Sequence, residues 1–143
     1  MRGTHGVLRK MATIINTQGL HTGEQFAHHG PMDQLDICAL AYIVAEDCPP
    51  PAELYTDEVA SIRLIECSAG AMQAIRAISA VLDTEPCETE IAPGHAVPDY
   101  IEHVSSWAMT PPVFDDRPPS TSEVIGRILR AADHLDTATP AAA

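Results

Sequence analysis

The chain has 143 residues, and its 20 acidic residues outnumber its 8 basic residues to give a formal charge of −12. That length suits a single domain whose core needs neither disulfide nor metal to hold it. The charge excludes direct binding to nucleic-acid phosphates, which requires Lys and Arg to displace counterions, and it excludes an anionic membrane surface as partner. We expect one domain over residues 1–136 and a disordered tail over 137–143.

Charge and cysteine placement narrow the class of protein further. Residues 11–62 and 77–116 each hold eight acids and no Lys or Arg, so a basic partner would meet these two stretches. The four cysteines form no C-x-x-C pair, the first residues do not resemble a signal peptide, and no apolar run reaches the length of a membrane helix. We therefore expect reduced thiols and a cytoplasmic protein.

Apolar residues recur at helical spacing in several segments of the chain. The expected helices cover about 6–18, 33–45, 57–82, 98–107 and 120–135. The second, which contains LDICALAYIVA, is apolar on nearly every face and should be the central helix, capped by Asp33 or Asp36. In the third, Gly70 is a candidate break, and in the last, Ser120 and Glu123 form a capping box.

Loops rich in Gly, Pro and acids separate these helices, at 19–31 and 83–98. Alternation typical of strands is confined to short pieces near 25–26 and 113–114. The predicted fold class is therefore all-α, a compact bundle of about five helices with irregular loops and at most a minor β-hairpin.

Three motifs resemble a family of small helical proteins of actinobacteria and their phages, whose function is undefined. They are a glycine turn at Gly19-Leu20-His21-Thr22-Gly23, a Cys-Ala helix at Ile37-Cys38-Ala39-Leu40-Ala41, and a closing stretch at Phe114-Asp115-Asp116-Arg117-Pro118 followed by Thr121 and Glu123-Val124-Ile125. The match is specific mainly over residues 114–135. The resemblance implies a single helical domain and supplies no reaction.

Titratable side chains concentrate in the loop that follows the first expected helix. His21, Glu24 and His28 would share a face if this segment were helical, and His and carboxylate ligands at such spacing hold zinc or iron. Glycines at 23 and 30 indicate a loop instead, in which these side chains are simply hydrated. The metal and catalytic candidates here are His21 and Glu24, with His28 as a metal or pocket residue.

A second set of candidates precedes the last expected helix. Asp115 and Asp116 could act as general acid and base, although Asp and Pro also make turns and acids favour helix N-termini. Trp107 is expected to anchor its helix in the core, or with Phe114 to border a pocket between loops 19–33 and 107–119. No complete catalytic, phosphate-loop or zinc motif is present.

Three functions fit these observations. We expect foremost an acidic accessory protein that binds another protein or forms a homodimer, with no cofactor. The first alternative is a small enzyme or a binder of a small molecule or divalent metal that uses the pocket between the two loops. The second alternative is an acidic decoy that occupies the basic surface of a nucleic-acid-binding protein.

The loop histidines supply a first prediction. If His21 and His28 belong to a metal or acid–base site, a divalent metal should raise the melting temperature by binding only the folded protein, or both imidazoles should titrate with perturbed pKa values. Thermal unfolding with added zinc and NMR titration measure these effects. Two freely titrating imidazoles and an unshifted melt would make the segment a connection only.

Overall fold

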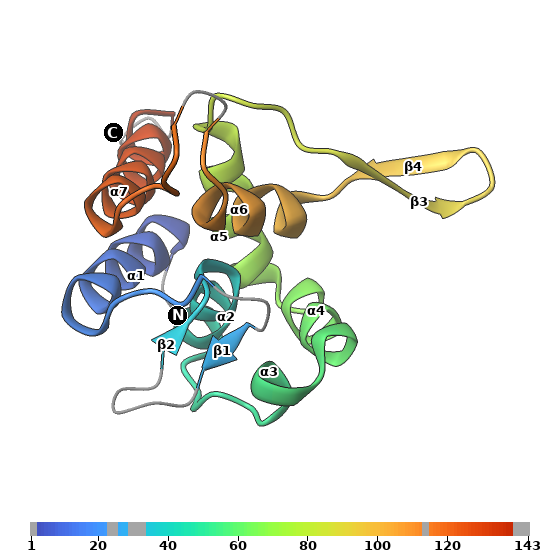
Figure 1. Ribbon diagram of the computed structural model, residues 1–143, viewed down its shortest axis with the longest axis horizontal. Coiled ribbons are helices and arrows are strands. Elements are labelled where there is room, and N and C mark those ends of the chain that lie inside the picture. Colours follow the sequence, from blue (N-terminus) through green and yellow to red (C-terminus); the bar gives the residue numbers. More distant parts are fainter. Residues whose placement is uncertain (1–2, 23–25, 29–33, 113–114, 139–143) are drawn as a thin grey trace, which may run out of the picture.

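Seven helices contain most of the residues that the computed structural model describes, which are 3–22, 26–28, 34–112 and 115–138. In chain order the helices are α1 (Thr4–Gln18), α2 (Ile37–Glu46), α3 (Glu53–Thr56), α4 (Glu58–Glu66), α5 (Ala69–Ala80), α6 (Tyr100–Met109) and α7 (Thr121–Ala138). Two antiparallel strand pairs complete the fold, β1 (Ala27–His28) with β2 (Gln34–Leu35) and β3 (Glu88–Ala92) with β4 (His95–Pro98) (Figure 1). The mostly helical class is confirmed. No helix within the described residues is long and apolar enough to span a membrane.

The described residues form seven helices rather than about five, because a break divides the segment predicted as one helix over 57–82 and the short helix α3 forms before it. Asp57 accepts a hydrogen bond from the Ala60 N–H and begins α4, while the short helix α3 precedes it. The main break lies before Gly70, at Ser68, whose hydroxyl accepts from the Ala71 N–H and caps α5. Side-chain caps of this kind satisfy backbone donors that a continuous helix would have paired internally.

Helices α2 and α5 form the centre of the molecule. Both are packed on several neighbours, and α5 contacts α1, α2, α4, α6 and α7. Six of the ten residues of α2 are buried, Leu40 among them, so its predicted central place is confirmed. The N-terminus of α5 approaches α2 closely, since a Cβ added at Gly70 would lie 3.1 Å from the Cβ of Ala45. Small residues therefore let the two helices pack at short range.

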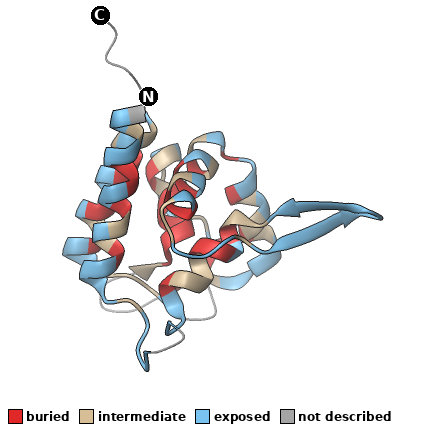
Figure 2. Ribbon diagram, turned by 90° about the horizontal axis from the view of Figure 1, so that it is seen from above, coloured by how far each residue is buried: buried red, intermediate tan, exposed pale blue. Residues whose placement is uncertain are grey.

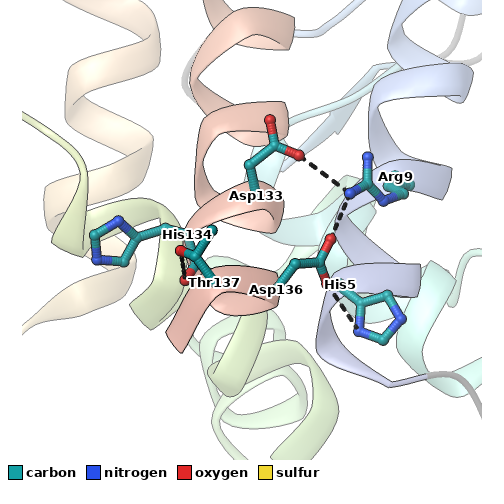
Figure 3. Close-up of polar contacts among 6 residues, drawn as sticks. All are labelled: His5, Arg9, Asp133, His134, Asp136 and Thr137. Carbon is teal, nitrogen blue, oxygen red and sulfur yellow. Dashed lines mark hydrogen bonds and ion pairs between the residues drawn. The ribbon is translucent and has the colours of Figure 1, made fainter. Parts of the chain in front are cut away.

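The helices α1 and α7 pack side by side along one flank (Figure 1). Arg9 of α1 donates to Asp133 at 3.1 Å and to Asp136 at 2.7 Å, and His5 lies 3.9 Å from Asp136 (Figure 3). The two carboxylates raise the pKa of Arg9. These ion pairs are exposed and contribute little to stability, so the apolar contact between the two helices provides most of the attraction.

The segment between α1 and α2, expected to be a polar loop, contributes to the core. Phe26 and Ala27 are buried, and the Asp36 N–H donates to the Phe26 carbonyl at 2.7 Å. The strand lies at Ala27–His28, beside the expected position 25–26, while the other expected strand piece at 113–114 falls outside the described residues. Phe26 and Ala27 are only two apolar residues in a polar segment, and a pattern this short does not predict burial.

A buried polar cluster joins α2 to α6. Asp36, which is 8% exposed, caps α2 by accepting from the Ala39 N–H at 2.7 Å, and its other oxygen accepts from the Ser105 hydroxyl at 2.9 Å. The same hydroxyl lies 3.3 Å from the sulfur of Cys38, which is buried and free. Burial raises the pKa of Asp36 to about 7 and the pKa of the Cys38 thiol well above its usual value, although the hydrogen bonds to Asp36 act in the opposite direction.

Asp36 should make stability depend on pH near neutrality. Its pKa is about 7 in the folded chain against 3.8 for a free carboxyl, so between these values the folded state holds a proton that the unfolded state has lost. The free energy of unfolding should therefore fall as the pH rises from about 4 towards 7, by an amount on the order of a few kcal/mol.

The matched variant is Asp36→Asn, which keeps the cap acceptor but cannot ionise. Urea unfolding at pH 4.5 and at pH 8 gives the free energy of unfolding that each protein loses as the pH rises. This loss should be smaller in the variant than in the wild-type chain, by an amount on the order of a few kcal/mol. An identical pH dependence in the two proteins would contradict the buried titration of Asp36.

Candidate functional site

A groove of about 910 Å³ lies between α6, α7 and the segment that follows α5. Both helices pack on α5 and make little or no contact with each other, which leaves the space between them unfilled. The lining residues are Asp83, Thr84, Glu85, Cys87, Glu102, His103, Ser106, Trp107, Thr110, Pro111, Pro112, Pro119, Glu123, Gly126, Arg127 and Arg130. Its volume is in the range of small-molecule sites, and its lining combines apolar surface with a few charged groups, as such sites do.

His103 is the most constrained polar side chain in the groove wall. It is 7% exposed, and its two ring nitrogens make hydrogen bonds of 2.7 Å, Nδ1 with the Ser79 hydroxyl and Nε2 with the Thr84 hydroxyl. Burial lowers the pKa of His103, while the nearby Glu85 carboxylate raises it to a smaller extent. A neutral imidazole has one donor and one acceptor, so two hydroxyls satisfy it fully.

The arrangement of Thr84, His103 and Ser79 links three elements at one point. Ser79 belongs to α5, His103 to α6, and Thr84 to the segment between α5 and β3. Thr84 and His103 line the groove, and Ser79 lies behind them. A hydroxyl bonded to a neutral imidazole can lose its proton to that ring, so the geometry permits general-base chemistry but also serves as a structural crosslink.

Arg127 and Asp83 line the groove and form an ion pair with each other. The guanidinium donates to the Val81 carbonyl at 2.6 Å and to the Asp83 carboxylate at 2.8 Å. These bonds to Arg127 lower the pKa of Asp83, and the charge of Arg130 adds to the effect. The pair therefore holds the segment after α5 against α7 and fixes the groove wall.

Of the predicted loop candidates, His21 can be placed relative to this groove, and it does not line it. His21 is half-buried, and its backbone N–H donates to the Leu35 carbonyl at 3.0 Å, which ties the loop to β2. Glu24 falls outside the described residues, and of His28 only the backbone, in β1, is described. Among the side chains that the structure describes, no three metal-ligating groups lie together. The metal and acid–base roles of this loop stay predictions.

The candidates near the last helix divide into two groups. Trp107 is half-buried and lines this groove, whereas the pocket expected between loops 19–33 and 107–119 stays a prediction. Asp115 and Asp116 are exposed and do not line it; Asp115 makes a turn, in which its carboxylate accepts from the Arg117 N–H at 3.3 Å. Phe114 lies outside the described residues. The groove takes part of its wall from loop 107–119, but none from the described part of loop 19–33.

Neither His103 nor Gly126 is among the predicted site residues, although the sequence holds a signal for each. His103 and Trp107 are four residues apart in the expected fourth helix, so they share a face of it. Gly126 interrupts the most regular amphipathic helix of the chain, where glycine is unfavourable. The partners Ser79 and Thr84 could not be found, because their proximity to His103 depends on tertiary packing.

A second feature, the hairpin of β3 and β4, extends away from the helical body, as Figures 1 and 2 show. All nine strand residues are exposed, including Ile91 at 66% and Val97 at 37%. The loop expected over 83–98 is thus an ordered ribbon in its second half, turned at Gly94 with φ of +76°. Its base is closed by the Asp99 N–H, which donates to the Cys87 carbonyl at 2.8 Å.

Comparison with protein-family models, curated proteins and solved structures gives no match for this chain. The resemblance to the actinobacterial and phage family therefore stays a prediction from the sequence motifs.

The burial of His103 leads to a testable pH effect. Since its pKa is lowered, its imidazole should titrate below the 6.5 of a free histidine in an NMR titration. The unfolded chain binds this proton first as the pH falls below 6.5, so the contribution of His103 to stability is lost on acidification. An imidazole that titrates at or above 6.5 would show that the ring is accessible to water and the two hydroxyl contacts are transient.

Proposed function

We propose that this chain is a small protein-interaction module that binds a basic protein partner through the β3–β4 hairpin. The observation that carries the proposal is the ordered ribbon that contributes none of its nine strand residues to the core. A two-stranded hairpin is marginal in water unless a further strand or another surface packs on it. A partner would supply that contact.

The hairpin offers both a backbone edge and apolar anchors. Its two strands pair only with each other among the described residues, so each has an outer edge with unpaired N–H and C=O groups. Such edges accept an added strand from a partner, and side chains beside them give specificity. Ile91 lies at the irregularity in the pairing between Glu90 and Ala92, where a bulge directs it outward.

Charge favours a basic partner over a second copy of the chain. The hairpin and its flanks over 83–99 hold five acidic residues, and no Lys or Arg occurs between residues 77 and 116. Two such hairpins would repel each other, whereas a basic surface would be attracted and its association would weaken with salt. The charge of the hairpin supports the interaction function expected from the sequence. The test below has to distinguish a basic partner from a homodimer.

The test is removal of the hairpin. Replacing 88–98 by a short Gly-Asn turn joins Cys87 to Asp99, which already share a hydrogen bond of 2.8 Å, so the helical body should unfold with nearly the same midpoint. Partner capture from a lysate should be lost with this variant. Neutralising Glu88 and Glu90 to Gln should weaken capture and remove much of its salt dependence.

Glu58→Gln is the matched control, because it removes one acid from α4 without touching the hairpin. Equal capture by the wild-type chain and the hairpin-deleted chain would contradict the proposal. A dimer that is seen by light scattering and lost with the hairpin would replace the basic partner with a second copy.

A further inference from the structure

The groove between α6 and α7 is a separate feature from the hairpin. The helices would pack in the same way if a side chain at position 126 filled part of it. Gly126 lies within the 18-residue helix α7 and lines the groove. A Cβ built there meets no atom within 4 Å, and the residue has no left-handed φ. Alanine would therefore fit and would favour the helix over glycine. Neither packing nor backbone conformation explains this glycine, which opens the groove where a side chain would narrow it.

Apolar residues contribute much of the groove lining. Trp107 belongs to α6, and Pro111, Pro112 and Pro119 belong to the segment between α6 and α7. An aryl or alkyl group that lies between Trp107 and Gly126 would bury apolar surface. A larger residue at position 126 would narrow the space for that group.

The charges around this space are mainly negative. Four acids and two arginines line the groove, and the Arg127 guanidinium is engaged by Asp83, on which Arg130 also acts. Three carboxylates remain, those of Glu85, Glu102 and Glu123. Glu85 lies close enough to His103 to act on its charge, and the lowered pKa of that imidazole leaves it neutral at pH 7. A ligand cation would therefore meet attraction and hydroxyl acceptors here.

We propose that the groove binds a small amphipathic organic cation, an amine whose aryl or alkyl body lies between Trp107 and Gly126 and whose ammonium faces Glu85 and Glu102. The indole face adds attraction for the cation where the two approach. The hydroxyls of Thr84 and Ser106 are acceptors for ammonium protons in the same wall. This site is independent of the hairpin and of the partner proposed for it.

The only tryptophan of the chain reports on the site, since Trp107 is a groove residue. Titration with phenethylamine or octylamine should change its emission saturably, with calorimetry giving the same dissociation constant. Hydrocinnamate and phenethyl alcohol share the apolar body but lack the cation, and both should bind at least about threefold more weakly than phenethylamine. Equal binding of amine, acid and alcohol, or no saturable binding of either amine, would overturn the proposal.

Variants place the ligand within the groove. Gly126→Leu should abolish amine binding by filling the space, while Gly126→Ala should raise the melting temperature and retain most of the binding. The double variant Glu85→Gln with Glu102→Gln should weaken the amine roughly threefold to tenfold and leave phenethyl alcohol unchanged. Glu58→Gln, on α4, is the charge control and should change neither. Amine binding unaffected by Gly126→Leu, in a protein that still unfolds cooperatively, would contradict the site.

Discussion

The arrangement of the molecule depends on the close packing of α2 and α5. Gly70 and Ala45 lie at their contact, and a Cβ added at Gly70 would lie 3.1 Å from the Cβ of Ala45, so a larger residue at position 70 would force the helices apart. In addition to α2, helix α5 contacts α1, α4, α6 and α7. Because α6 and α7 meet α5 rather than each other, the groove between them is a direct result of this packing, as is the place where the chain leaves α5 toward the hairpin.

Two buried titratable groups join α6 to this centre, and they respond to pH in opposite directions. Asp36 holds the N-terminus of α2 to Ser105, and His103 holds Ser79 of α5 to Thr84. Desolvation favours the neutral form of each, which is the protonated carboxyl in one case and the unprotonated imidazole in the other. Acidification below pH 6.5 therefore strengthens the contribution of Asp36 and weakens that of His103, so the two effects on the attachment of α6 oppose each other.

Sequence periodicity predicted the helices that bury a continuous apolar face. The end of α1 at Gly19, the apolar α2 and the Ser120 cap before α7 all follow from local residue patterns. Features that depend on distant residues are not predictable in this way. Phe26 enters the core and His103 meets Ser79 and Thr84 only because tertiary packing brings them together.

The candidate site shows the same division. Trp107 can be identified from its residue type, whereas the remaining groove residues are ordinary polar and small side chains whose role comes from a space between helices. The hairpin resembles a loop in the sequence because its prolines, acids and glycine lack the alternation of a half-buried strand. Exposure on both faces removes that pattern, so a projecting ribbon carries little periodic signal.

The pairing of α1 with α7 has a consequence for how the chain reaches this structure. Arg9 and Asp133 are separated by 124 positions, and α1, whose buried residues include Leu8, Met11 and Ile15, packs extensively on α7. Until α7 emerges from the ribosome, α1 has only part of its final cover. Closing such a long loop delays the pairing relative to the contacts among α2, α4 and α5. The central helices can therefore assemble first, with α1 held back as an amphipathic segment that a chaperone could bind during translation.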